Sequence, residues 1–203
     1  MCLLTGREPH RCAAWDNHWI IFPEVMTWPR YFGEHGYSTA LVGKMHFGGA
    51  DQMQGFDYRP YGDLRHGLGH QPEPLSMFPG YSGPESAGPI EIPESLLSDV
   101  VTTTESLAFV LEQADREPDR AWFMVASYTR PHPLFTVPSR YLARCRGRVP
   151  APPEPDSDAL EPYVRALQQG AGYADLSADQ RLRAAEAYYA CVDFVDDCIG
   201  DLL

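Results

Sequence analysis

The strongest signal in this sequence is the stretch Thr39-Ala40-Leu41-Val42-Gly43-Lys44-Met45-His46-Phe47. An apolar run with strand propensity ends at a glycine, and a lysine and a histidine then follow two residues apart. Lysine carries a compact charge with three donors, and histidine donates or shuttles a proton near neutral pH. Because open α/β sheets bind ligands at the carboxyl ends of their strands, the stretch predicts an anion site there. A Lys-x-His pair alone also occurs by chance on solvated loops, so the neighbouring segments decide between the two interpretations.

A helix is predicted just before this strand. Thr27 is a typical N-cap, Pro29 fits the first turn and Gly36 fits a helix end, so residues 27–36 predict a short helix. A helix, a glycine and a strand in this order form an α/β unit. A second strand is predicted at residues 121–128, because a nearly continuous apolar run is typical of a central parallel strand covered on both faces. The predicted fold class is therefore α/β.

Two longer helices are predicted from apolar residues at helical spacing. The first spans residues 98–114, and the second begins with a capping box at Ser177 and runs to residue 203. We expect the buried face of the first helix to contain Val101, Leu107, Ala108 and Leu111, and that of the second to contain Tyr188, Val192, Val195, Ile199 and Leu202.

The second strand end presents another histidine. The strand at residues 121–128 is followed by Thr129-Arg130-Pro131-His132-Pro133. The two prolines fix the backbone and lower the entropy of a loop that presents one side chain. His132 is therefore a candidate for contact with a substrate. Arg130 either adds positive charge to the site or forms a surface salt bridge.

The composition excludes several classes of protein. The 203 residues contain 28 Asp and Glu against 16 Lys and Arg, which gives a net charge of −12. This charge argues against nucleic-acid binding, so a local positive pocket has to attract any anionic substrate. No apolar run is long enough to span a membrane. The five cysteines are scattered and odd in number, which favours reduced thiols and a cytoplasmic location over a disulfide framework or a zinc site.

Four segments together resemble the type I sulfatases of the alkaline-phosphatase-like superfamily. Leu4-Thr5-Gly6-Arg7 resembles the end of the sulfatase signature, Cys-x-Pro-Ser-Arg-x-x-x-Leu-Thr-Gly-Arg. The stretch 36–47 resembles the family's Gly-Tyr-x-Thr, strand and Gly-Lys-x-His pattern, and residues 48–57 continue it much as choline sulfatases do. Pro131-His132-Pro133 and the helix at 187–200 also match family segments. The resemblance implies part of an alkaline-phosphatase-like sandwich with a central, mainly parallel sheet flanked by helices.

The resemblance also implies roles for individual residues. Lys44 and His46 would bind the sulfate oxygens and stabilise the charge that develops in the transition state. Asn17 would orient the sulfate group, with a simple turn position as its alternative. His132 would assist the leaving oxygen. Arg130 is a candidate for substrate binding from its charge alone, and not from the resemblance.

The nucleophile and the metal ligands implied by the resemblance lie outside this sequence. In the family the signature cysteine becomes formylglycine, and by motif spacing that residue precedes Met1. Cys2 falls on a variable position and is expected to be a small buried residue. A divalent cation, typically calcium, would be held by residues before Met1 and after Leu203. We therefore expect residues 1–203 to be a partial N-terminal catalytic domain that contributes no metal ligand and has no turnover alone.

The expected function is that of a sulfuric ester hydrolase acting on a small sulfate ester. A phosphonate monoester or phosphodiester hydrolase of the same superfamily is the alternative, because those enzymes share the segment around His132. A non-catalytic anion-binding remnant is an alternative from another class. The expected partner is a small anionic sulfate, phosphate or phosphonate ester, with no nucleic acid and no membrane, and homo-oligomerisation is left open.

Overall fold

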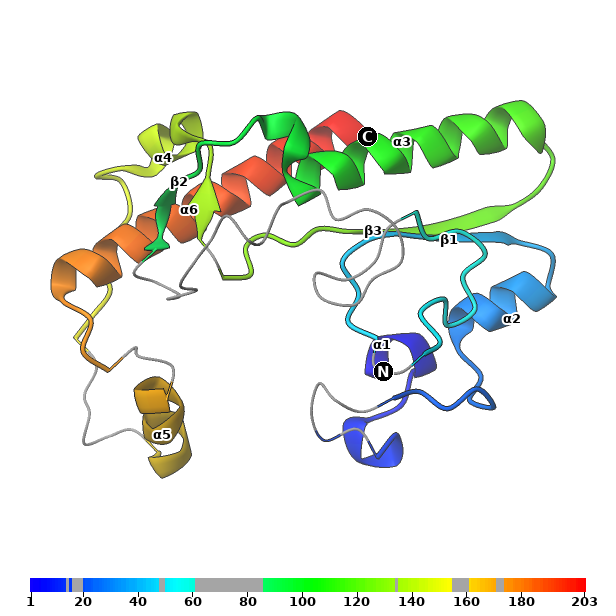
Figure 1. Cartoon of the computed structure of the whole chain (residues 1–203), viewed down its shortest axis with the longest axis horizontal. Helices are drawn as coiled ribbons and strands as arrows, with labels where there is room; N and C mark the ends of the chain where they lie inside the picture. The colour runs from blue at the N-terminus through cyan, green and yellow to red at the C-terminus, as the bar shows by residue number, and fades with distance from the viewer. Residues whose placement is uncertain are drawn as a thin grey trace. The chain divides into compact units, whose positions relative to one another are not determined.

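The computed structural model describes residues 1–13, 15, 20–47, 50–60, 86–133, 135–154, 161–170 and 174–203. Apart from the last two residues, the chain divides into two compact units, Met1–Leu75 with Ser95–Thr129, and Ser76–Glu94 with Arg130–Asp201. The elements of the chain (Figure 1) are α1 (Cys2–Thr5), η1 (Pro9–Arg11), α2 (Trp28–Glu34), β1 (Ser38–Gly43), β2 (Gly88–Pro89), η4 (Glu94–Leu96), α3 (Ser98–Arg116), β3 (Trp122–Ser127), β4 (Thr136–Val137), α4 (Ser139–Cys145), α5 (Pro162–Gly170) and α6 (Ala178–Leu202).

Strand β1 is the centre of the first unit. It pairs with β3 in parallel, and the register places Ser38 opposite Trp122 and Gly43 opposite Ser127. On its other side, Ala40 forms an isolated parallel bridge. All six residues of β1 are buried, whereas β3 is half-buried to exposed. Helices and parallel strands confirm the α/β class, but within the described residues β1, and not β3, is the fully buried strand with a neighbour along each edge.

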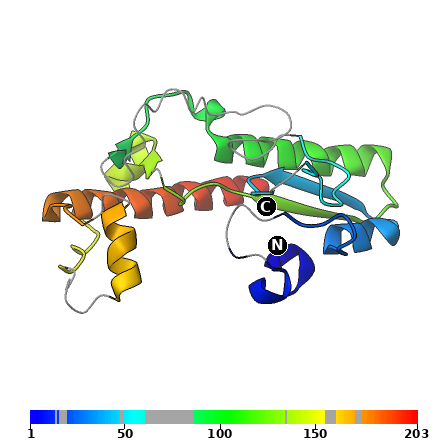
Figure 2. The same ribbon diagram turned by 60° about the horizontal axis from the view of Figure 1, so that its bottom comes forward.

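Helices α2 and α3 cover opposite faces of the β1–β3 pair (Figure 2). The ring of Phe123 lies 4.6 Å from that of Trp28 in α2. The ring of its neighbour Trp122 lies 6.0 Å from that of Phe109 in α3. Successive strand side chains point to opposite faces, so these two contacts place one helix on each side. The first unit is therefore a layered helix–sheet–helix arrangement.

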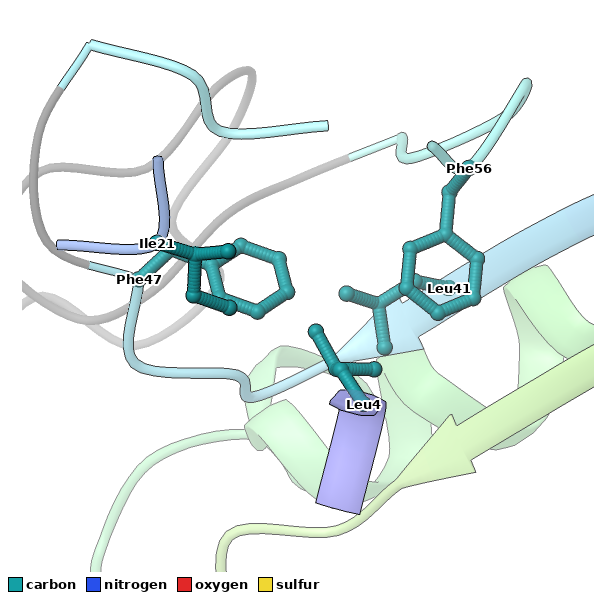
Figure 3. Close-up of a cluster of buried hydrophobic side chains, with 5 residues drawn as sticks. All are labelled: Leu4, Ile21, Leu41, Phe47 and Phe56. Atoms are coloured by element: carbon teal, nitrogen blue, oxygen red, sulfur yellow. The ribbon is translucent and has the colours of Figure 1, made fainter. Parts of the chain in front are cut away.

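A buried apolar cluster anchors the loop that follows β1. Its members are Leu4, Ile21, Leu41, Phe47 and Phe56, and Figure 3 shows these side chains facing one another. Leu41 comes from the middle of β1 and Leu4 from α1, whereas the other three come from loops. Phe47 is only 8% exposed. Because burying a phenyl ring is worth about 1.5–3 kcal/mol, Phe47 holds the loop against the core.

The short helix predicted at residues 27–36 is confirmed as α2. The Thr27 hydroxyl accepts a hydrogen bond from the backbone N–H of Arg30 at 3.4 Å and caps α2. Helix α1 ends at Gly6, whose φ of +63° closes the last turn. The expectation for Cys2 was wrong, because its side chain is exposed.

The expected buried face of α3 was wrong in part, since Val101 and Leu107 are only half-buried. Leu111 is 68% exposed and Ala108 is exposed, while the buried face consists of Ser98, Asp99, Thr102, Thr103, Ser106 and Phe109. The Thr102 hydroxyl donates to the carbonyl of Ser98 at 2.9 Å, which satisfies it inside the helix. Small side chains of this kind allow the helix to approach the strands closely. A count of apolar residues therefore points to the wrong face.

The second unit is built around α6. The Ser177 hydroxyl accepts from the Gln180 N–H and the Gln180 side chain accepts from the Ser177 N–H, so the predicted capping box is confirmed. Strands β2 and β4 pair in parallel beside it, and neither they nor α5 were predicted. The expected face of α6 was wrong in detail: Tyr188, Val192 and Ile199 are exposed, and the buried residues are Ala184, Ala187, Ala190, Cys191, Phe194 and Cys198.

Candidate functional site

The carboxyl ends of β1 and β3 meet at Gly43. Its φ is +99°, and a Cβ atom built there would lie 2.0 Å from the carbonyl oxygen of Ser127 and 2.9 Å from the hydroxyl of Thr102. The next backbone N–H, that of Lys44, donates to the same Ser127 carbonyl at 2.9 Å. Only glycine tolerates both the backbone angle and this close approach. Gly43 therefore sets the direction in which the following loop leaves the sheet.

Lys44 and His46 lie together on this loop, where the sequence predicts them. The apolar side chains between and after them, Met45 and Phe47, pack into the core cluster. Lys44 is half-buried and His46 is exposed. Lys44 is also the only lysine in the sequence. The structure thus presents a lysine and a histidine from one short loop at a strand end, and their binding roles remain predictions.

The buried side chain of Arg59 stabilises the loop that follows β1. Arg59 is 6% exposed, and one of its terminal nitrogens donates to the Met45 carbonyl at 3.0 Å. The other terminal nitrogen donates to the backbone carbonyl of Gln52 and to its side-chain oxygen at 3.1 Å. The guanidinium carbon lies 4.9 Å from the ring centre of Phe47. Arg59 therefore joins the start of the loop to the turn that follows it.

The start of α3 fixes the backbone immediately after β3. Asp99 lies in the first turn of α3 and is fully buried, and its carboxylate accepts from the Thr129 N–H at 2.7 Å. The Thr103 and Tyr128 hydroxyls are 3.1 Å apart. A carboxylate is favoured in the first turn of a helix because it faces unsatisfied N–H groups and the positive end of the dipole. The backbone that follows β3 is therefore fixed by hydrogen bonds, as is the backbone that follows β1.

Arg130 and His132 belong to the second unit. Arg130 is 6% exposed, its Nε donates to the Thr136 carbonyl at 2.7 Å, and its guanidinium lies over the ring of Phe194 at 5.6 Å. This burial contradicts a surface salt bridge. His132 is exposed, with Nδ1 2.6 Å from the Pro133 carbonyl. Since a carbonyl only accepts, Nδ1 is the donor, and Nε2 is the nitrogen that remains for proton transfer.

Asn17, the candidate for orienting the sulfate group, lies outside the part of the chain that the structure describes. Within the described residues, no group of three or more His, Cys, Asp or Glu side chains is placed to hold a metal ion. In that same part of the chain, no helix has both the length and the apolar character needed to cross a membrane.

A hollow of about 650 Å³ lies on the second unit, between α4 and α6. It is lined by charges of both signs, including Arg144 and Asp193, which form an ion pair at 3.0 Å. Cys145 also lines it, and burial, together with Asp193, raises the pKa of its thiol. A raised pKa lowers the thiolate fraction, so this cysteine is a poor nucleophile. None of the four described candidate residues, Lys44, His46, Arg130 and His132, lines this hollow.

Sequence reasoning missed the residues that support the site. Arg59 and Asp99 are charged side chains, which are rarely buried, so no spacing rule predicts their burial. The sequence does offer a signal for the close contact at Gly43. A glycine that ends an apolar strand indicates that another backbone segment passes close to it. The partner in that approach, Ser127, is far away in the sequence.

The whole chain matches one protein family. A family model described as Sulfatase matches residues 1–203, and the chain belongs to the sulfatase family. This agrees with the resemblance seen in the motifs around Lys44 and His132.

Similarity to individual relatives extends over nearly the full chain. It is 24% identical to the choline-sulfatase of Rhizobium meliloti (strain 1021), over 98% of this chain and 42% of the relative. It is 27% identical to the iduronate 2-sulfatase of Mus musculus, over 98% of this chain and 41% of the relative. The chain therefore spans about two fifths of the length of the curated relatives it matches.

Solved structures support the fold. The structure of BT4656 in complex with its substrate, D-glucosamine-2-N,6-O-disulfate, matches with a TM-score of 0.61 and 17% identity, and the match covers 100% of this chain and 50% of that one. The structure of Ps i-CgsB matches with a TM-score of 0.61 and 18% identity, over 99% of this chain and 42% of that one. At these identities the likeness shows the fold alone, which is that of the sulfatases.

Proposed function

We propose that this chain is part of the catalytic domain of a sulfuric ester hydrolase and that Lys44 and His46 bind the oxygens of a small sulfate ester. The observation that carries the proposal is the loop after β1, which presents both donors at a strand end in a chain of the sulfatase family. With a net charge of −12, the chain repels anions at long range. The attraction therefore has to come from local donors such as these.

Hydrolysis of a sulfate ester is accelerated by hydrogen-bond donors that are held in position before the reaction. Hydrolysis of a sulfate ester moves negative charge onto the leaving oxygen, and fixed donors stabilise such charge without reorganising. The Lys44 ammonium gives a compact positive charge, and the His46 ring gives a directed N–H. For His132 we propose that the imidazolium gives its Nε2 proton to the leaving oxygen and is left as the neutral ring with its proton on Nδ1, which donates to the Pro133 carbonyl.

The family resemblance assigns a formylglycine nucleophile and a calcium ion to residues outside this sequence. In the complete protein these groups would supply the nucleophile and a hard positive charge on the sulfate oxygens. The described residues offer no cluster that fits such an ion. The roles proposed for this chain are therefore limited to its own donors.

The proposed substrate is a small sulfate ester, with choline sulfate as the first candidate. Support comes from the similarity to a choline-sulfatase over 98% of this chain. A phosphonate monoester or phosphodiester is the alternative substrate, because the segment Thr129-Arg130-Pro131-His132-Pro133 also resembles hydrolases of those esters.

The test is turnover by the product of the complete open reading frame that contains this chain. We expect hydrolysis of choline sulfate, which is measured as the release of sulfate. Lys44→Ala should lower kcat/KM by about 10²–10³-fold, the usual effect of removing one charge-stabilising donor. Arg116→Ala is the matched control, because this arginine is an exposed cation paired with Glu112 on α3.

Three results separate the hypotheses. Faster turnover of phosphonate or phosphodiester substrates than of sulfate esters would favour the alternative hydrolase. No turnover of any ester, combined with sulfate binding that is weaker in Lys44→Ala than in the parent protein, would favour a non-catalytic anion-binding remnant. A Lys44→Ala variant as active as Arg116→Ala would refute the role of Lys44.

A further inference from the structure

We propose that Arg59 is a positioning residue, which fixes the backbone of Lys44-Met45-His46 so that both side chains face one anionic group. The inference rests on the proposed function for the role of Lys44 and His46. It concerns a residue that no sequence motif identified. Arg59 is buried, and its guanidinium donates to backbone carbonyls in the loop and in the turn that follows it.

Burial is the first argument. Arginine is almost never buried to 6% exposure unless its donors are satisfied, because removing an unpaired charge from water is very costly. Here the acceptors include two backbone carbonyls from different parts of the chain, those of Met45 and Gln52. A planar fork with several donors can hold two carbonyls at once, whereas a lysine ammonium has no such fixed geometry.

The position of the Met45 carbonyl is the second argument. This carbonyl belongs to the peptide that joins Met45 to His46, so its direction sets the direction in which the His46 side chain leaves the backbone. The preceding N–H, that of Lys44, is held by the Ser127 carbonyl at 2.9 Å. Arg59 thus fixes one end of a three-residue segment whose other end is fixed by β3.

Gln52 links the end of the loop, at Phe47, to Arg59. The Gln52 side-chain amide donates to the Phe47 carbonyl at 3.0 Å, while its oxygen accepts from Arg59 at 3.1 Å. The Phe47 ring lies beneath the guanidinium and inside the core cluster. Arg59, Gln52 and Phe47 therefore form one connected unit. Loss of the arginine would release the Met45 carbonyl and the Gln52 carbonyl together.

The chain offers a matched control at the opposite end of β1. The Arg120 guanidinium also donates to two backbone carbonyls, those of Gly36 at 3.1 Å and Tyr37 at 3.3 Å. Arg120→Met removes the same kind of interaction from the same unit without touching the loop after β1. Any effect that Arg59→Met shows and Arg120→Met lacks is therefore specific to the loop.

The first readout does not depend on catalysis. Reductive methylation of the complete protein with ¹³C-formaldehyde labels its lysine ammonium groups and keeps their charge, and the Lys44 methyl signal is the one that Lys44→Arg lacks. We expect Arg59→Met to shift the Lys44 methyl signal and to speed amide hydrogen exchange at residues 44–47, and Arg120→Met to leave both unchanged. Arg59→Lys, which keeps the charge, provides a second variant if Arg59→Met does not fold.

The second readout is turnover by the complete protein. A loop displaced by about 1 Å costs on the order of 10²-fold in kcat/KM, so we expect a loss of that size for Arg59→Met. In Arg59→Ala, added guanidinium should restore part of the lost rate, and urea at the same concentration should not. An Arg59→Met variant that matches Arg120→Met in exchange, methyl signal and turnover would overturn the inference. A parent protein without turnover, combined with altered exchange in Arg59→Met, would refute the proposed function and support the positioning role.

Discussion

Replacement of Gly43 by alanine tests whether the two strand ends must meet as closely as the structure shows. The added methyl group would lie 2.0 Å from the Ser127 carbonyl oxygen and 2.9 Å from the Thr102 hydroxyl, and the backbone would keep a φ of +99°. The nearest atom belongs to a backbone and not to a flexible side chain, so the strands themselves have to move.

The magnitude follows from three costs. An alanine in this backbone region costs about 1–3 kcal/mol, overpacking about 1–3 kcal/mol, and loss of the Lys44 N–H bond to Ser127 about 1 kcal/mol. Because the strands can relax part of the clash by moving, we expect Gly43→Ala to lower the free energy of unfolding by about 3–5 kcal/mol, a large share of the 5–15 kcal/mol typical of domains. The variant should also lose the proposed anion site, because the loop carrying Lys44 leaves the sheet from this point.

The assay is urea-induced unfolding followed by tryptophan fluorescence, since Trp28 and Trp122 pack on the two faces of the sheet. For a slope of about 2 kcal/mol/M, the midpoint should fall by roughly 1.5–2.5 M. Gly33→Ala is the matched control: Gly33 lies in α2 with no atom within 4 Å of the added methyl group, so we expect a gain of about 0.5–1 kcal/mol. Equal midpoints for Gly43→Ala and the parent protein would refute the reasoning.

Two further predictions concern a phenol and a helix cap. Burial, and then the neighbouring Glu105 carboxylate at 3.4 Å, raise the pKa of Tyr58, so the folded state keeps this proton above pH 10 while the unfolded state releases it. The stability that this group contributes is present below pH 10 and is lost as the pH rises through the raised pKa. We therefore expect the free energy of unfolding, measured by chemical denaturation at a series of pH values, to fall less steeply above pH 10 in Tyr58→Phe than in the parent protein. Identical slopes for the two proteins would contradict this. Ser177→Ala removes the hydroxyl half of the capping box and should lower the free energy of unfolding by about 0.5–2 kcal/mol, with Ser177→Asp close to the parent protein in thermal unfolding.

The local elements could be predicted from the sequence because their signals are local. Thr27, Gly36 and Ser177 mark helix ends through caps and backbone angles that depend on a few neighbouring residues. The strand that leads to Lys44 is marked in the same way, by an apolar run and a glycine. The position of the candidate site at a strand end followed from these signals together with the general rule for α/β sheets.

The buried faces of the long helices could not be predicted, because packing partners decide them. On α3 the close approach to the strands selects small polar residues such as Thr102, and their hydroxyls bond within the helix. On α6 the closely packed face uses Ala187, Ala190 and Cys191. Arg59 was missed for the same reason, since its acceptors at Met45 and Gln52 are brought to it only by the fold.

The parallel pairing of β1 with β3 has a consequence for the order in which the protein acquires its structure. The paired residues are about 80 positions apart, which is a long loop to close and a feature of slowly folding topologies. At about 5–20 residues per second, a ribosome adds those residues over on the order of 4–16 s after β1 has been made. During that time β1, the more deeply buried strand of the first unit, lacks the partner that covers its edge. Helix α2 and the bridge from Ala40 to Tyr58 involve nearby residues, so these contacts are the ones available to shield the nascent strand.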